Sequence, residues 1–204
     1  MPFGAPCLIV GRQERRHDAL ATTVFTIGKA TIGGRALPCM VRDISDGGMR
    51  IRMQNPPHLG ERVLIEMRGL EPRFARTRWV LADEAGLAFE QRCNLPKIFA
   101  IRSNRPSKAS RQPRFDLRRM AMLLIDGQAQ VVEVVDISVG GARLALGGQI
   151  ARGSVCTLTL GGFLPQPDLL GEICWVDDRQ CGLRFTVPLS STALACALTS
   201  DLDI

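Results

Sequence analysis

Three arginines lie close together near the start of this 204-residue chain, in the stretch GRQERRH: Arg12, Arg15 and Arg16. Guanidinium groups at this spacing repel one another, and an anion held among them relieves the repulsion. Arginine also binds phosphate through paired hydrogen bonds and stacks on planar bases. The cluster therefore indicates a site for an anionic ligand, with a solvated basic arm as the alternative.

A carboxylate and a hydroxyl follow in the stretch DISDGGMRI, where Asp43 and Ser45 precede Gly47 and Gly48. Asp and Ser can bond to nearby backbone amides and hold a tight turn, and glycine permits positive φ and close approach. A carboxylate beside a hydroxyl also suits the donor edge of guanine, while arginine suits its acceptor edge. The two stretches together predict a guanine-nucleotide site, and a plain hairpin turn is the alternative.

The same turn recurs 93 residues later as DISVGGARL, which supplies Asp136, Ser138 and Gly141. Further on, WVLADEAGLAF from Trp79 is matched by WVDDRQCGLRF from Trp175, at an offset of 96 residues. Two motifs in the same order at nearly constant spacing predict a duplication into tandem domains. We expect a first domain over 1–102, a basic Ser/Pro-rich linker over 103–113 and a second domain over 114–204.

Each half is a series of short strands. The stretch MRIRM alternates apolar and charged residues, which is typical of antiparallel sheet with one wet face. The expected strands of the first half are Thr22–Ile27, Leu37–Ile44, Met49–Met53, Arg62–Arg68, Ala75–Ala82 and Gly86–Gln91. Those of the second half are Arg119–Asp126, Gln130–Ile137, Ala142–Leu146, Val155–Leu160, Leu170–Val176 and Cys181–Val187.

Closing such a sheet removes its exposed edges. The predicted fold is therefore all-β, with two tandem six-stranded antiparallel β-barrels, each followed by a short helix, at Leu95–Arg102 and Ser190–Leu198. Trp79 and Trp175 are expected in the barrel cores.

Composition excludes several classes. The net charge of +6 favours an anionic partner. The seven cysteines form no CxxC pair, and His17 and His58 lie far along the chain from Cys174 and Cys181, so we expect reduced thiols in a cytoplasmic protein and no metal site. No window resembles a signal peptide or a membrane span. Neither a catalytic Ser/His/Asp arrangement nor a P-loop occurs, so we expect no enzyme, no catalytic residues and no cofactor.

Arg12-x-x-x-Arg16 followed by Asp43-x-Ser45-x-x-Gly48 resembles the PilZ domain family. The resemblance covers about Arg12 to Gln91 and again about Arg111 to Val187, and includes the late Trp-Val and Gly-Leu-x-Phe strands. It implies split β-barrels that bind the bacterial second messenger cyclic di-GMP. It further implies that the arginines wrap over the ligand, that Asp and Ser contact a guanine edge, and that the glycine allows the backbone geometry.

The two copies differ in their arginines. A register that starts at Arg15 places Ala19 at the second arginine, so Arg12 and Arg16 are preferred in the first copy. In the second copy Arg114 directly precedes the first strand, as the resemblance implies for the second arginine, but Ser110 stands four residues earlier. Arg111 is displaced by one residue, and pairing Arg114 with Arg118 moves the latter toward the strand. We expect a weaker second site made by Arg111, Arg114, Arg118, Asp136, Ser138 and Gly141.

The net charges of the two halves also favour the first copy as the stronger anion site. Residues 1–102 contain 16 Lys and Arg against 10 Asp and Glu, whereas residues 114–204 contain 7 against 10. An anion is therefore expected mainly at the first domain.

Three functions remain open. The first is a cyclic di-GMP receptor that changes conformation or partner binding when it captures the ligand, with a protein partner of unknown identity. The second is a degenerate PilZ-type adaptor that binds no nucleotide. A nucleic-acid-binding barrel is third, because the chain has no Tyr and its other aromatics lie in apolar strands, which gives no evident stacking platform.

Overall fold

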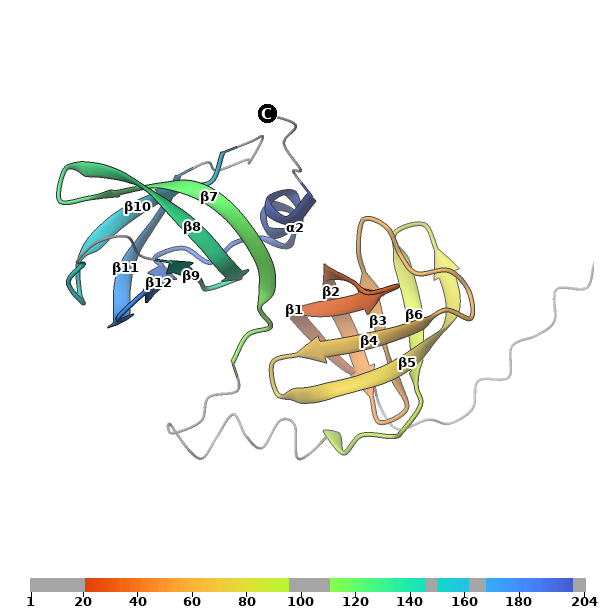
Figure 1. The fold of residues 1–204 in the computed structure, drawn as a ribbon. Helices are drawn as coiled ribbons and strands as arrows, with labels where there is room; N and C mark the ends of the chain where they lie inside the picture. The colour runs from red at the N-terminus through yellow and green to blue at the C-terminus, as the bar shows by residue number, and fades with distance from the viewer. Residues whose placement is uncertain (1–20, 96–110, 146–149, 162–167, 200–204) are drawn as a thin grey trace, which may run out of the picture.

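The described residues form two antiparallel β-barrels and one short helix. The computed structural model describes residues 21–95, 111–145, 150–161 and 168–199 (Figure 1). The first barrel consists of β1 (Thr22–Ile32), β2 (Arg35–Ser45), β3 (Gly48–Arg52), β4 (Arg62–Met67), β5 (Leu70–Leu81) and β6 (Glu84–Phe89). The second consists of β7 (Phe115–Ile125), β8 (Gln128–Ser138), β9 (Gly141–Ala145), β10 (Val155–Thr159), β11 (Asp168–Asp177) and β12 (Gln180–Phe185). The predicted fold class is confirmed.

Both barrels close in the same way. The strand order is β1-β2-β3-β6-β5-β4 in the first and β7-β8-β9-β12-β11-β10 in the second, and each order returns on itself. Each barrel therefore consists of hairpins that are brought together by the pairing of β3 with β6 and of β1 with β4, or of their counterparts.

The register of the two copies agrees residue by residue. Thr22 pairs with Ile44 in the first barrel, and Phe115 pairs with Ile137 in the second, which is the same pair displaced by 93 residues. The offset is still 93 at β4 and β10, because Leu64 pairs with Thr31 and Thr157 with Leu124. It becomes 96 at β5 and β11. The extra residues therefore enter between β10 and β11, away from the turns that join β2 to β3 and β8 to β9.

Side chains at every second position of each strand point inward and fill the two barrel interiors. Inward residues such as Val41, Ile51 and Ile65 in the first barrel, and Leu123, Leu144 and Leu158 in the second, are fully buried. Their outward neighbours along each strand are exposed or half-buried. This period of two is the pattern that the sequence predicts.

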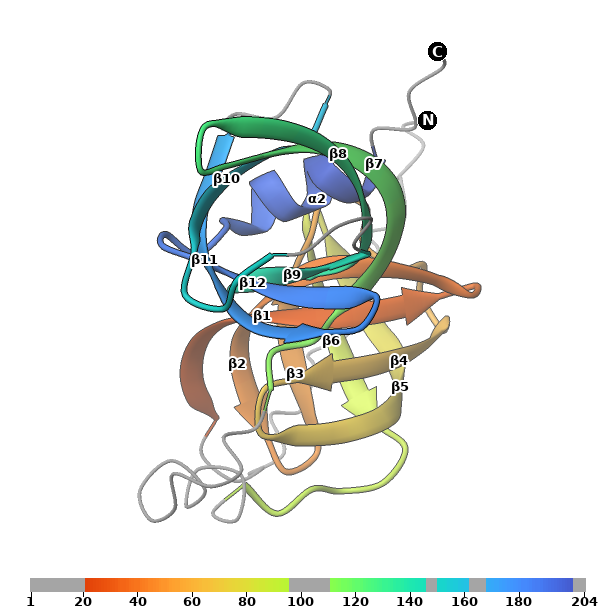
Figure 2. The ribbon, with the colours of Figure 1, turned by 60° about the vertical axis from the view of Figure 1, so that its left-hand side comes forward.

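A short helix, α2 (Ser191–Thr199), follows the second barrel and matches the prediction at 190–198. Its Ala193, Leu194 and Ala197 are buried in the core of that barrel, across one of its open ends (Figure 2). The helix also lies between the two barrels, in contact with β2 (Figure 1). The helix predicted at 95–102 falls outside the described residues, apart from Leu95.

The two tryptophans do not lie in the cores, so that prediction is wrong. Trp79 is 36% exposed and Trp175 38% exposed, on the outside of their barrels. Each indole lies flat against a glycine of the neighbouring strand: a Cβ built on Gly86 or Gly182 would come within 2.0 Å or 1.9 Å of the indole Nε1. Because glycine has no side chain, the outer surface of that strand leaves room for the indole ring.

Four cysteines, Cys39, Cys93, Cys156 and Cys181, are buried as free thiols. Burial raises the pKa of Cys39 to about 12 and that of Cys156 and Cys181 to about 11. In the described part of the chain no three His, Cys, Asp or Glu side chains gather as a metal site would require. No helix among the described residues is long and apolar enough to cross a membrane.

Candidate ligand-binding site

The Asp-x-Ser turn places its carboxylate opposite an arginine. A two-residue turn joins β2 to β3, so Ser45 pairs with Gly48 and Asp43 pairs with Arg50. In the second barrel Asp136 pairs in the same way with Arg143. A β-bulge just before each aspartate shifts the register, and bulges commonly re-aim a side chain in this manner.

Serine and glycine of the motif hold the turn. The hydroxyl of Ser45 donates to the carbonyl of Gly48 over 3.3 Å, and that of Ser138 to the carbonyl of Gly141 over 3.1 Å. The serines therefore donate to a carbonyl rather than accept from an amide. Neither Gly48 nor Gly141 adopts the left-handed conformation; each is needed for close approach, since an added Cβ would lie 2.1 Å or 2.2 Å from a carbonyl oxygen of the neighbouring strand.

In the second barrel two arginines converge on one buried carboxylate. Arg114 Nη1 lies 2.5 Å from Asp136 Oδ1, and Arg143 Nη2 lies 2.6 Å from Asp136 Oδ2. The Asp136 side chain is only 5% exposed, whereas the guanidinium-bearing side chains are 41% and 37% exposed. A buried carboxylate needs such partners, and the arginines keep further N–H donors for another anion.

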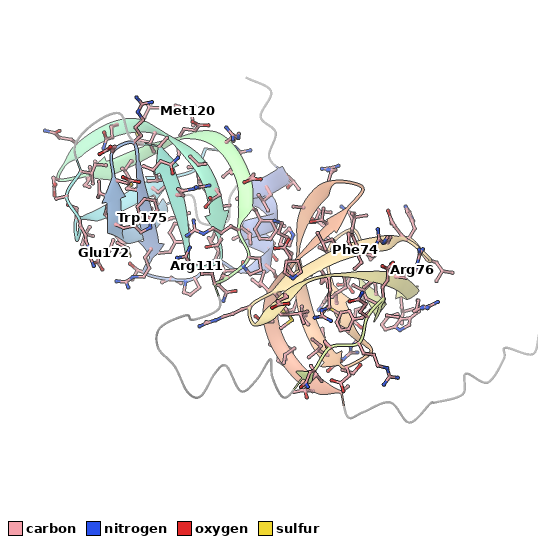
Figure 3. The ribbon with its side chains drawn as sticks, turned by 60° about the horizontal axis from the view of Figure 1, so that its bottom comes forward. Phe74, Arg76, Arg111, Met120, Glu172 and Trp175 are labelled. Carbon is pink, nitrogen blue, oxygen red and sulfur yellow. The ribbon has the colours of Figure 1, made fainter. Side chains whose placement is uncertain are left out.

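These groups line a cleft of about 760 Å³ on the second barrel. Its other walls come from the segment before β7 and from β11 and β12. The full lining is Arg111, Gln112, Arg114, Asp136, Ser138, Gly140, Arg143, Trp175, Asp177 and Gln180. Arg111 and Trp175 both lie on the lower side of the second barrel in Figure 3, away from Met120. A half-exposed indole beside three guanidiniums is suited to a ligand with both an aromatic face and negative charge.

Two polar atoms of this cleft have no partner within the described structure. Arg143 Nε and Gln112 Oε1 are buried and make no hydrogen bond. Such groups are uncommon in native proteins and are costly unless something satisfies them. Their position among cleft-lining residues agrees with a site completed by a ligand.

The described part of the first barrel is arranged differently. Arg50 binds Asp43 through Nε at 2.7 Å and Nη2 at 2.6 Å, and its Nη1 lies 3.5 Å from Glu84. The counterpart of Glu84 in the second barrel is the neutral Gln180, and Ala21 stands where Arg114 stands. One guanidinium therefore faces two carboxylates here, whereas two face one carboxylate in the second barrel.

Comparison with known families matches the PilZ domain at residues 11–94 and again at 109–198. The chain belongs to the PilZ domain family. By sequence, no curated protein matches it.

Solved structures to which the chain is similar include PlzA of Borreliella burgdorferi in complex with c-di-GMP, at 12% identity over 85% of this chain and 87% of that chain, with a TM-score of 0.38. YcgR of Escherichia coli in complex with c-di-GMP matches at 12% identity over 84% and 80%, with a TM-score of 0.32. The inhibitor of motility of Bacillus subtilis matches at 12% identity over 86% and 94%, with a TM-score of 0.29.

The structure brings part of the predicted PilZ site together. Arg111, Arg114, Asp136 and Ser138 share the cleft, although Arg111 was assigned to the linker. Arg118 lies exposed in the bulge of β7 and does not line the cleft. Arg12, Arg15 and Arg16 fall outside the described residues, so their role in the first PilZ domain stays a prediction.

Sequence reasoning missed Gln112, Arg143, Trp175, Asp177 and Gln180, which line the cleft. Arg143 had a detectable signal: a two-residue turn after Ser138 places position 143 directly opposite Asp136. Gln112 lies between Arg111 and Arg114, which the sequence does predict for this site. Trp175, Asp177 and Gln180 had no local signal, because barrel closure brings β11 and β12 beside β9.

Proposed function

We propose that this chain is a cyclic di-GMP receptor whose second PilZ barrel holds the ligand. The observation that carries the proposal is the convergence of Arg114 and Arg143 on the buried Asp136 in a cleft that also contains Arg111 and Trp175. The dinucleotide has two phosphates and two guanines, so it needs guanidinium donors, a carboxylate acceptor and an aromatic face.

Each group has an evident task in this proposal. Arg111 and Arg114, from the segment before β7, neutralise phosphate, and the indole of Trp175 offers a surface for a guanine ring. Asp136 accepts from the N–H donors of a guanine edge while Arg143 holds its carboxylate in position. Ligand that draws on Arg114 loosens its bond to Asp136, which couples capture to the segment that leads into the second barrel.

That coupling supports an effector role, and we propose that the protein acts in the bacterial cytoplasm. The segment before β7 connects the barrels, and Phe115 at the start of β7 lies 5.9 Å from the Lys29 ammonium of the first barrel. Ligand that reorders Arg111 and Arg114 therefore changes the contact between the barrels or exposes a surface to a protein partner. We propose no catalytic step.

A titration with cyclic di-GMP tests the proposal. The chain has one tryptophan per barrel, so the Trp79→Phe variant reports binding at Trp175 alone. We expect the fluorescence of Trp175 to change and Arg114→Ala to weaken affinity about 10- to 150-fold, since a charge-assisted contact contributes about 1.5–3 kcal/mol. Arg152→Ala is the matched control, because Arg152 is exposed on the same barrel and does not line the cleft.

Calorimetry of Arg16→Ala determines whether the first barrel also binds. A lower stoichiometry with unchanged affinity at Trp175 would assign a second ligand to the first barrel. Absence of heat and of fluorescence change for the folded chain at any messenger concentration would defeat the receptor proposal and favour an adaptor. The described first-barrel site, where Arg50 is already held by Asp43 and Glu84, suits that adaptor role.

A further inference from the structure

An exposed apolar surface covers one side of the second barrel, remote from the cleft. Along β7, Met120, Met122 and Leu124 point outward and are 60%, 43% and 47% exposed. The surface continues across neighbouring strands, because Met122 pairs with Val131 on β8, and Leu124 pairs with Thr157 on β10. This surface, the β7 face, consists of Met120, Met122, Leu124, Val131, Val155 and Leu170. Contiguous exposed apolar residues of this kind mark interaction sites.

The equivalent side of the first barrel is already covered. At the offset of 93, Met120 corresponds to Ile27, which packs with Ala36 against the core of the second barrel. Met122 corresponds to Lys29, whose ammonium lies 5.9 Å from the ring of Phe115. This side of the barrel is therefore the side that the chain buries when a neighbour is present. Within the described ranges only the copy on the second barrel is left open, and it is the more apolar of the two.

Charges flank the β7 face in a self-complementary arrangement. Arg118 and Asp126 stand four residues before and four residues after Met122, and both are exposed. Neither forms an ion pair within the described part of the chain. When two copies of β7 lie antiparallel about a two-fold axis at Met122, the end of β7 that carries Arg118 in its bulge lies beside the end of the other copy that carries Asp126 in its turn.

We propose that the β7 face binds a second copy of this chain, forming a two-fold symmetric dimer with its axis at Met122. The apolar residues supply the burial, and the two Arg118–Asp126 pairs set the antiparallel direction. Met120 lies at the edge of the second barrel opposite Trp175 and Arg111 (Figure 3). The dimer therefore leaves both clefts open, and its formation does not require nucleotide.

Sedimentation velocity of the full chain over a range of concentrations tests the dimer. We expect the mass to rise from 22.3 kDa to twice that value. Met122→Glu places like charges together at the axis and should raise the dissociation constant by about tenfold or more. Leu59→Glu is the matched control: Leu59 is 72% exposed on the first barrel, and its substitution should leave the dimer intact.

Charge removal tests the antiparallel direction. Arg118→Gln and Asp126→Asn should each weaken the dimer, and the double variant should weaken it no further than either single variant, because both remove the same pairs. Asparagine keeps the left-handed conformation at position 126, where φ is 49°. Additive effects of the two substitutions would overturn the proposed pairing.

A cysteine at the axis gives a direct measurement. Met122→Cys should be joined to its own copy by a short bismaleimide cross-linker, since a residue on a two-fold axis faces its own copy across packed sheets about 10 Å apart. The chain with its native cysteines is the control. A monomer at every concentration, a dimer that is insensitive to Met122→Glu, or no cross-link at position 122 would each overturn the proposal. Circular dichroism confirms that each variant is folded.

Discussion

The two barrels share a register to the residue and yet differ where a ligand would bind. Both place an aspartate opposite an arginine across the same turn. In the second barrel Arg114 joins that pair and a neutral Gln180 stands near it, whereas in the first barrel Ala21 and Glu84 occupy those positions. Duplication thus preserved the hairpin while the groups around it diverged.

In each domain the charge of the groups around the turn therefore has the opposite sign to the net charge of the domain. The first domain is basic overall and the second acidic, but the described groups at the first turn carry excess negative charge and those of the cleft excess positive charge. An anion is bound by groups within a few ångströms, because solvent and salt screen the rest. We therefore expect any anion binding at the first barrel to depend on Arg12, Arg15 and Arg16.

The largest expected effect tests what the barrels have in common. Gly48→Ala and Gly141→Ala should each destabilise their own barrel by about 3 kcal/mol or more, because the new Cβ meets a backbone carbonyl that cannot move without parting two strands. Urea unfolding followed at the single tryptophan of each barrel measures this. Gly47→Ala and Gly140→Ala, which meet no atom within 4 Å, are the controls. Unequal costs in the two barrels would contradict a purely structural role.

The next prediction compares how much the carboxylates of Asp136 and Asp43 stabilise their barrels. Asp136→Asn should destabilise the second barrel by about 1–3 kcal/mol, because it removes the charge from a buried group that two arginines hold. Asp43→Asn should cost the first barrel less than about 1 kcal/mol, since Asp43 is more exposed and has one arginine partner at close range. Denaturant midpoints compare them. Equal losses of unfolding free energy would mean that the contact of Arg114 with Asp136 does not stabilise the second barrel.

A gain-of-function substitution tests the missing arginine. Ala21 is exposed and directly precedes β1, so Ala21→Arg should build the counterpart of Arg114 beside Asp43. In an Arg114→Ala background we expect the first barrel to bind cyclic di-GMP about three- to tenfold more tightly, because Glu84 offsets part of the added charge. Calorimetry measures it, with Ala21→Gln as the uncharged control. No change in affinity would indicate that other residues prevent binding at the first barrel.

The last effect appears only at alkaline pH and concerns the buried thiols. The pKa of Cys39 in the folded state is about 12, above its ordinary value of 9.0, so the folded state holds the proton more tightly than the unfolded chain. Stability from this group is complete below pH 9 and is lost as the pH rises toward 12. Cys39→Ala should reduce the loss of first-barrel stability with rising pH. Cys181→Ala should do the same for the second barrel over a narrower pH range, up to about 11. Unfolding midpoints between pH 8 and 11 test the difference, and parallel curves for variant and native chain would contradict it.

Much of the fold could be predicted because its signals are local. Alternation in β3 and in β7 identifies strands and their buried face, and the repeated turn identifies the hairpin register. The two tryptophans were misplaced because apolar strands suggest a core, whereas glycine on the next strand provides an outer shelf. The missing counterpart of Arg114 could have been found by comparing the two copies at the offset of 93.

The sequence by itself determined the duplication, the strands and the pairing of each aspartate with the arginine across its turn, since these depend on residues a few positions apart. Only the tertiary structure decided that Trp175 and Gln180 stand beside Arg114 and Asp136, and that the β7 face is left open. Those neighbours come from strands far apart in the chain. Barrel closure brings them together, and no local periodicity records that outcome.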